Sequence, residues 1–112
     1  MSQLTTHILD TSIGKPAQSV SVTLEYLISG TWKKIAEGIT NADGRITDLL
    51  VSSNPMQTGF YRLIFDSAAY FKGQDKKTFY PRVSIEFEIS DASHYHVPLL
   101  LNPYGYSTYR GS

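Results

Sequence analysis

Two stretches of the chain alternate between apolar and polar residues, and this period of two constrains the fold more than any other feature. Successive side chains of a β-strand point to opposite faces of a sheet, so such alternation predicts strands with one buried face. The stretches are Ser19–Ile28 and Arg82–Ile89. The expected buried sets are Val20, Val22, Leu24, Tyr26 and Ile28 in the first, and Val83, Ile85, Phe87 and Ile89 in the second.

Five further segments have a weaker strand pattern, and Gly, Asn, Asp, Ser and Pro separate them at short intervals. About seven short strands in a chain of this length predict one all-β domain, residues 1–112, built as an antiparallel sandwich. Only Ser67–Gln74 has a helical pattern. The weaker strand candidates are Leu4–Leu9, Thr31–Gly38, Arg45–Leu50, Gly59–Asp66 and Tyr95–Leu101.

Two connections between strands carry further expectations. In Asn41–Gly44, Asp43 can satisfy the turn backbone and Gly44 accepts a positive φ, so a strand is expected to begin at Arg45. Ser90–Ser93 separates two strand candidates, which are therefore expected to be hairpin neighbours. At the start of the second of these strands, His94 and His96 are expected to project to the same side.

The composition argues against several classes of function. Ten Lys and Arg balance ten Asp and Glu, so the net charge does not favour nucleic acid or an anionic membrane. The chain has no cysteine, which excludes disulfides, thiolate metal sites and cysteine nucleophiles. No apolar run approaches the ~20 residues that cross a bilayer, and no signal-like segment opens the sequence, so we expect a cytoplasmic protein.

Three charged or titratable residues are candidates for chemistry, and each also has a structural explanation. His7 and His96 lie in strand candidates among apolar neighbours, where a histidine is often half-buried and bound to the backbone. Either could instead act as a base that titrates near neutral pH. Arg45 could be an exposed strand-end charge paired with Asp43 or Asp48, or a fixed cation that binds carbonyl oxygens.

The C-terminal segment 102–112 is rich in tyrosine. Chain ends are usually poorly ordered, but Tyr104, Tyr106 and Tyr109 offer more aromatic surface than a disordered tail carries. We therefore expect an ordered tail that lines a site.

Several segments, in this order and spacing, resemble the 5-hydroxyisourate hydrolases, which belong to the transthyretin-related proteins. The last four residues match the family's C-terminal signature completely. The resemblance extends from about Leu4 to Ser112. The matching segments are Thr5–Asp10 (TTHILD), Gly14–Pro16, Asp43–Arg45 (DGR), Phe60–Tyr61, Phe79–Pro81, His94–Leu101 (HYHVPLLL) and Tyr109–Ser112 (YRGS).

The resemblance implies a transthyretin-like sandwich of two four-stranded sheets with one short α-helix. It also implies a homotetramer, a dimer of dimers, with active sites between the dimers and completed by adjoining chains. Metal and cofactor are not part of the family's chemistry. The residues implied at the site are His7, Arg45 and His96 as catalytic groups, of which His7 and Arg45 also bind the substrate with Tyr109, Arg110, Gly111 and Ser112; His94 is a neighbour.

The implied reaction is hydrolysis of a cyclic amide bond of 5-hydroxyisourate, a planar product of urate oxidation, in purine catabolism. A histidine can activate water near pH 7 and then protonate the leaving nitrogen, and we assign this work jointly to His7 and His96. Arg45 would stabilise the oxyanion. Two alternatives stay open: a small-molecule carrier of the transthyretin type on the same scaffold, and a zinc hydrolase that uses His7, His94 and His96.

Overall fold

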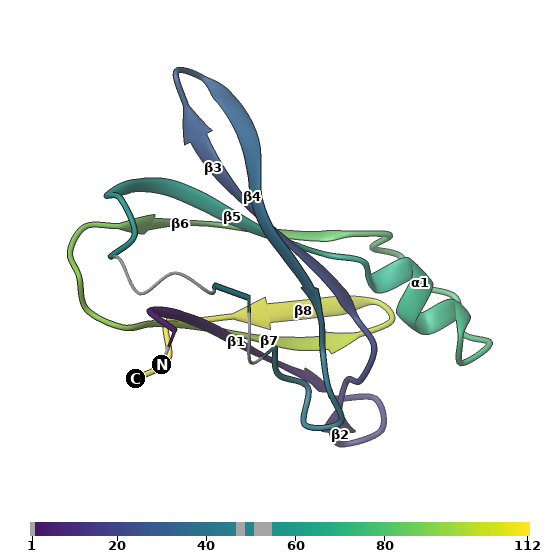
Figure 1. Cartoon of the computed structure of the whole chain (residues 1–112). Coiled ribbons are helices and arrows are strands. Elements are labelled where there is room, and N and C mark those ends of the chain that lie inside the picture. The colour runs from purple at the N-terminus through teal and green to yellow at the C-terminus, as the bar shows by residue number, and fades with distance from the viewer. Residues whose placement is uncertain (1, 47–48, 51–54) are drawn as a thin grey trace.

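The computed structural model describes residues 2–46, 49–50 and 55–112, which form two four-stranded sheets (Figure 1). The strand orders are β2-β1-β7-β8 and β4-β3-β5-β6. All neighbouring strands are antiparallel except β1 and β7, which are parallel. The elements are β1 (Leu4–Asp10), β2 (Lys15–Pro16), β3 (Ser21–Ile28), β4 (Thr31–Ile39), β5 (Gly59–Phe65), α1 (Ser67–Lys72), β6 (Val83–Ile89), β7 (Tyr95–Asn102) and β8 (Gly105–Thr108).

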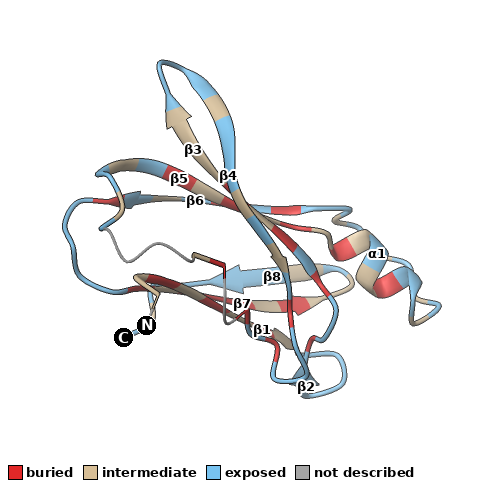
Figure 2. Ribbon diagram, in the orientation of Figure 1, coloured by how far each residue is buried: buried red, intermediate tan, exposed pale blue. Residues whose placement is uncertain are grey.

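The core lies between the two sheets and is filled mainly by alternating residues of β1, β3, β5, β6 and β7 (Figure 2). The period of two predicted from the sequence is confirmed in β3 and β6, where Val22, Leu24, Val83 and Ile89 are at most 1% exposed. Burying each such side chain stabilises the fold by about 1.5–3 kcal/mol. The alternation fades toward the tip of the β3–β4 hairpin, where Ile28 is 44% exposed.

The short helix α1 closes one end of the sandwich (Figure 1). Asp66 caps its first turn by accepting a hydrogen bond from the Ala69 amide at 3.1 Å, and Phe71 is completely buried. The helix predicted over residues 67–74 is therefore confirmed, although it ends at Lys72 because Gly73 follows. Within the described residues, no helix has the length and apolar character needed to cross a membrane.

The expectation that β6 and β7 form a hairpin is wrong. They lie in different sheets, so the chain crosses the sandwich between Ile89 and Tyr95. The Tyr95 hydroxyl holds this connection, since it accepts a hydrogen bond from the Ser90 amide at 3.0 Å and donates one to Asp91 Oδ1 at 2.9 Å. Two strands with alternating patterns can bury their apolar faces either as neighbours in one sheet or as members of two facing sheets. The local sequence does not distinguish these two cases.

The strand expected over Arg45–Leu50 is not seen in its described part, where Arg45 forms a single bridge with His7. Thr47 and Asp48 lie outside the described residues. Two strands, β2 and β8, were not expected from the sequence, because they are short and carry no clear alternation of apolar and polar residues.

Candidate active site

The outer face of the β2-β1-β7-β8 sheet carries the two candidate histidines. On β1, the side chains of Leu4, Thr6 and Ile8 are buried in the core, so His7 projects outward. On β7, burial of Tyr95 and Val97 on either side turns His96 to the same outer face. The parallel register places Thr5 beside His96 and Pro98 beside His7. The pairing of β1 with β7 therefore brings together residues almost 90 positions apart in the sequence.

Arg45 reaches this face through the turn that precedes it. Gly44 has a φ of +73°, and a Cβ there would overlap the Ile8 carbonyl oxygen. Its own carbonyl accepts a hydrogen bond from the Ile8 amide at 2.9 Å, which fixes the turn against β1. We expected Asp43 to stabilise the turn, but the side chain of Asn41 does so. Asn41 Oδ1 accepts hydrogen bonds from the amides of Asp43 and Arg45 at 2.9 and 3.1 Å.

The C-terminal tail is ordered along β7, as expected. After β8, the Gly111 amide donates a hydrogen bond to the His96 carbonyl at 2.8 Å. Earlier in the tail, Thr108 Oγ1 donates to the Pro98 carbonyl at 2.7 Å. The N-terminal segment ends at the same place, because the Tyr95 amide donates to the Gln3 carbonyl at 2.7 Å, and Figure 1 shows the two termini side by side.

A hollow of about 380 Å³ lies where these segments meet. It brings Arg45, His96 and Ser112 together, as expected, but its lining includes neither His7 nor Gly111, and it adds two further side chains. These are Thr5 and His94. The site is thus built from the start of β1, the turn before Arg45, the start of β7 and the end of the chain.

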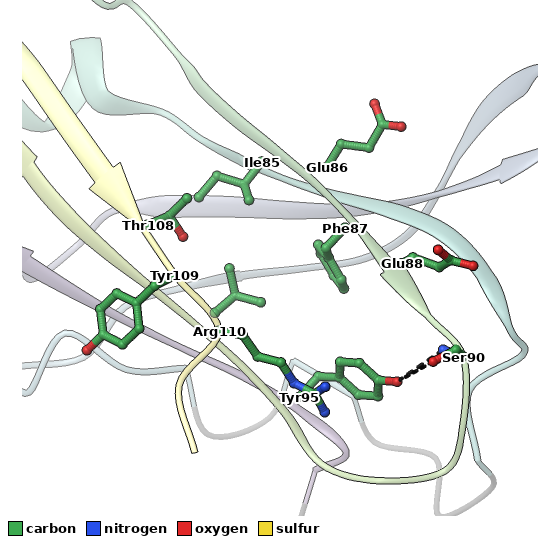
Figure 3. Close-up of a pocket in the computed structure, with 10 residues that line it drawn as sticks. Ile85, Glu86, Phe87, Glu88, Ser90, Tyr95, Thr108, Tyr109 and Arg110 are labelled. Carbon is green, nitrogen blue, oxygen red and sulfur yellow. Dashed lines mark hydrogen bonds between the residues drawn. The ribbon is translucent and has the colours of Figure 1, made fainter.

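Tyr109 and Arg110 instead line a second hollow, of about 290 Å³, between the edge strands β6 and β8 (Figure 3). The guanidinium of Arg110 lies over the Tyr95 ring, 4.1 Å from its centroid. It also donates hydrogen bonds to Ser93 Oγ at 3.3 Å and to the His94 carbonyl at 3.2 Å. Within one chain, the structure does not bring Tyr109 and Arg110 to the hollow that holds His96.

Both histidines are held in their neutral form. Burial lowers the pKa of His7 below 6.5, and the positive charge of Arg45 lowers it further, while Asp43 acts in the opposite direction. Burial also lowers the pKa of His96, and so does the positive charge of Arg45. At neutral pH, two unprotonated imidazoles therefore lie close to a permanently charged guanidinium.

The sequence also left open a zinc site formed by the three histidines and an ion pair between Arg45 and a nearby aspartate. Within the part of the chain that the structure describes, no three His, Cys, Asp or Glu side chains are grouped so as to hold a metal ion. The described geometry therefore gives no support to a site formed by His7, His94 and His96. Arg45 forms no ion pair with Asp43 among the described residues, and its other expected partner, Asp48, lies outside them.

Sequence reasoning missed two residues that build the site. Thr5 Oγ1 lies 2.8 Å from His96 Nδ1, and its position two residues before His7 was the available signal, because both then share one face of β1. The second missed residue is Asn41, whose place at the first position of a turn favours the hydrogen bonds that it makes.

A neutral imidazole can take a proton from water, and a neighbouring guanidinium can stabilise the negative charge that then develops on a carbonyl oxygen. The arrangement of His7, His96 and Arg45 is therefore suited to hydrolysis of a small, carbonyl-rich molecule. Hydrolysis by direct attack of water needs no nucleophilic side chain.

Comparison with known proteins identifies the relatives of this chain. The profile of the HIUase/Transthyretin family matches residues 4–111. The 5-hydroxyisourate hydrolase of Mesorhizobium japonicum is 45% identical over 98% of this chain and 92% of its own. The structure of Klebsiella pneumoniae 5-hydroxyisourate hydrolase superposes with a TM-score of 0.84 and 40% identity, covering 97% of this chain and 92% of that one.

A structure of sea bream transthyretin in complex with thyroxine superposes with a higher TM-score and a lower identity. Its TM-score is 0.90 at 33% identity, over 98% of this chain and 95% of that one. The expected transthyretin-like sandwich is confirmed by these neighbours. The chain belongs to the HIUase/Transthyretin family.

Proposed function

We propose that the protein hydrolyses 5-hydroxyisourate to 2-oxo-4-hydroxy-4-carboxy-5-ureidoimidazoline, a step of urate degradation. The relatives that carry the name of this hydrolase match the chain over nearly its full length. The fold alone does not distinguish an enzyme from a carrier, so the assignment depends on the side chains of the site.

One observation carries the proposal: two neutral histidines share the outer face of one sheet with the guanidinium of Arg45. Arg45 is among the groups that lower the pKa of both His7 and His96, so its charge acts on both rings. A base that is unprotonated at neutral pH and a fixed cation are the two groups that attack of water on an amide needs.

In the proposed reaction, His7 and His96 share the proton transfers. One ring takes a proton from water as the water oxygen bonds to the carbonyl carbon of the cyclic amide. The carbon–nitrogen bond of the ring then breaks, and the protonated histidine returns a proton to the leaving nitrogen. Arg45 stabilises the negative charge on the carbonyl oxygen, an effect worth about 3 kcal/mol of the barrier when one donor is lost.

Gly111 and Ser112 are proposed to bind the substrate beside the histidines, and the place of Ser112 in the first hollow supports this. Tyr109 and Arg110 line the second hollow in one chain. Their proposed role in binding substrate therefore requires that an adjoining chain bring them to the site.

A homotetramer, arranged as a dimer of dimers with the sites between dimers, is part of the proposal. The outer face of the β2-β1-β7-β8 sheet supports it, because Leu9 and Leu100 lie opposite each other there and neither is buried within one chain. Light scattering should give a mass of about 50 kDa, against 12.5 kDa for one chain. A monomer at micromolar concentration would contradict this assembly. A single domain and a cytoplasmic location stay predictions.

The test generates 5-hydroxyisourate in place with urate oxidase and follows the decay of its absorbance with and without the protein. We expect acceleration by the wild type and a loss of at least about 100-fold in His96→Asn, because the base is removed while the ring is replaced by a smaller polar group. Circular dichroism and light scattering verify the fold and mass of the variant.

No acceleration by a folded wild-type tetramer would overturn the proposal and favour the carrier. Thyroxine binding, measured by calorimetry on the same sample, then tests that alternative directly. Retention of the full rate by folded His96→Asn would overturn the assigned role of His96 and leave the activity itself intact.

A further inference from the structure

The hydroxyl of Thr5 lies between two histidine rings at the site. Its Oγ1 is 2.8 Å from Nδ1 of His96 and 2.9 Å from Nε2 of His94. The two rings are nearly parallel, with 16° between their planes and 6.3 Å between their centroids. A catalytic ring is therefore connected through one hydroxyl to a second ring that the proposed mechanism leaves unused.

Proton counting couples the two rings. A hydroxyl has one proton to donate and can accept from other donors. If Thr5 donates to a bare nitrogen of His94, then Nδ1 of His96 has to carry the proton of the second hydrogen bond. The tautomers of His94 and His96 are thus not independent.

The geometry allows two arrangements of these protons, and the proposed role of His96 as a base requires one of them. The nitrogen of His96 that faces Thr5 is Nδ1. A proton on Nδ1 leaves the lone pair on Nε2, the form in which a neutral imidazole acts as a base.

Gly111 prevents the ring of His96 from moving away from Thr5. A Cβ at Gly111 would lie 2.5 Å from Cδ2 of His96, so the backbone of the tail packs directly against that edge of the ring. A flipped ring would turn a carbon toward Thr5 and lose the hydrogen bond. The ring is therefore fixed from two sides.

We propose that Thr5 and His94 are positioning residues that hold His96 in the Nδ1–H tautomer and share the charge that it acquires during the reaction. The charge-sharing part rests on the proposed hydrolase function. The tautomer part concerns the protein without substrate.

No proton is gained or lost in the charge-sharing step. When Nε2 of His96 takes a proton from water, the ring carries protons on both nitrogens and is positive. The Nδ1 proton then moves to Oγ1 of Thr5 as the hydroxyl proton moves to Nε2 of His94, and the positive charge moves with them. The same shifts in reverse restore the charge to His96 before Nε2 protonates the leaving nitrogen.

The surrounding charges decide how far this sharing proceeds. Among the charged groups, Arg45 lowers the pKa of His96 most, so a positive charge held by His96 alone is disfavoured at this site. On the far side, Arg110 donates to the His94 carbonyl at 3.2 Å, so a second guanidinium contacts that residue. We therefore expect charge shared between the rings, with neither holding it alone.

The first test measures tautomers directly. ¹⁵N chemical shifts of the labelled, substrate-free protein at pH 8 should show His96 with a protonated Nδ1 and a bare Nε2. In Thr5→Val, which removes the hydroxyl and keeps the shape, we expect a shift toward the other tautomer, and Thr5→Ser should restore the original one. An Nε2–H tautomer in the wild type, or no change in Thr5→Val, would overturn the proposal.

The second test distinguishes a positioning role of Thr5 and His94 from a merely structural one. Thr5→Val and His94→Phe should lower kcat on the order of tenfold, with KM changed much less. In Thr5→Val the acid limb of the pH profile should move to lower pH, because protonated His96 loses an acceptor and its pKa falls. Thr5→Ser should recover most of the rate.

Thr23→Val is the matched control, since Thr23 is also a half-buried strand threonine but lies in the other sheet. It should leave kcat and the pH profile unchanged. Loss of kcat in Thr5→Val with an unmoved acid limb would overturn the proposed sharing of charge between His96 and His94. A wild type without hydrolase activity would refute the proposed function, and the tautomer measurement would still decide the role of Thr5.

Discussion

The last four residues of the chain divide between two hollows of different character. Gly111 packs against His96, and Ser112 lines a hollow that also contains Arg45 and His94. Tyr109 and Arg110 line the other, whose floor is made by the aromatic and aliphatic side chains of β6 and β7. The first hollow gathers positive and titratable groups, whereas the second is lined mainly by apolar surface.

This difference indicates that a contiguous sequence signature has two separable parts. The Tyr-Arg half lies between the edge strands of the two sheets, and the Gly-Ser half lies beside His96. Substitutions on the two sides should differ in kind, the first affecting stability, assembly or substrate binding and the second affecting the chemical step.

The largest effect in this comparison is expected from Arg45→Ala on the polar side. Loss of its charge should lower kcat/KM by about 100-fold, equivalent to about 3 kcal/mol. The histidines are active when neutral and their pKa values lie below 6.5, so the wild type should retain more than about half of its plateau rate at pH 6.5. Without Arg45 these pKa values rise, and the acid limb should move to higher pH.

Arg82→Ala serves as the matched control, because Arg82 is exposed and precedes the edge strand β6. Its rate and pH profile should equal those of the wild type. An unchanged acid limb in Arg45→Ala would mean that the guanidinium does not act on the histidines.

A smaller effect is expected from Gly111→Ala, which introduces a Cβ against the His96 ring. Displacing the ring from its hydrogen bond should lower kcat on the order of tenfold without unfolding the protein. Gly105→Ala is the control, since a Cβ there would lie 3.6 Å from the Asn102 side chain, an ordinary contact. Equal rates in the two variants would contradict the proposed contact between the tail and the ring.

The smallest effect on rate is expected from Arg110→Ala on the apolar side. Arg110 is exposed, and its cation–π contact with the buried Tyr95 contributes about 0.5–1 kcal/mol. Urea denaturation at fixed protein concentration should therefore show a loss of about 1 kcal/mol in the free energy of unfolding. The change in kcat should stay within about twofold, and the proposed role of Arg110 in substrate binding should appear as a rise in KM. A loss of rate as large as that in Arg45→Ala would remove the distinction between the two hollows.

Much of the fold could be predicted from the sequence, because alternation is a local signal. The strands β3 and β6 followed directly from it, and the resemblance to the family supplied the two-sheet sandwich, which is confirmed. The path of the chain between strands is not local. Ser90–Ser93 connects the two sheets, although its length and composition are also those of a hairpin loop.

The candidate site was predicted in outline, and its supporting residues were not. His96, Arg45 and Ser112 are brought together as expected. Their contacts depend on register, since Thr5 meets His96 only because β1 and β7 pair in parallel. The side to which each residue of the tail turns depends on the course of the backbone after β8. Neither register nor that course could be derived from residue types alone.

The parallel pairing of β1 with β7 also has a consequence for how the molecule folds. Thr5 and His96 are separated by 91 positions, so their contact closes nearly the whole chain into a loop, and contacts of this kind form late and slowly in all-β proteins. A nascent chain would hold β1 and the turn around Gly44 before β7 and the C-terminal tail could complete the site. Catalytic competence would then report that folding is complete, and recovery of activity after dilution from denaturant would follow the slowest step of that process.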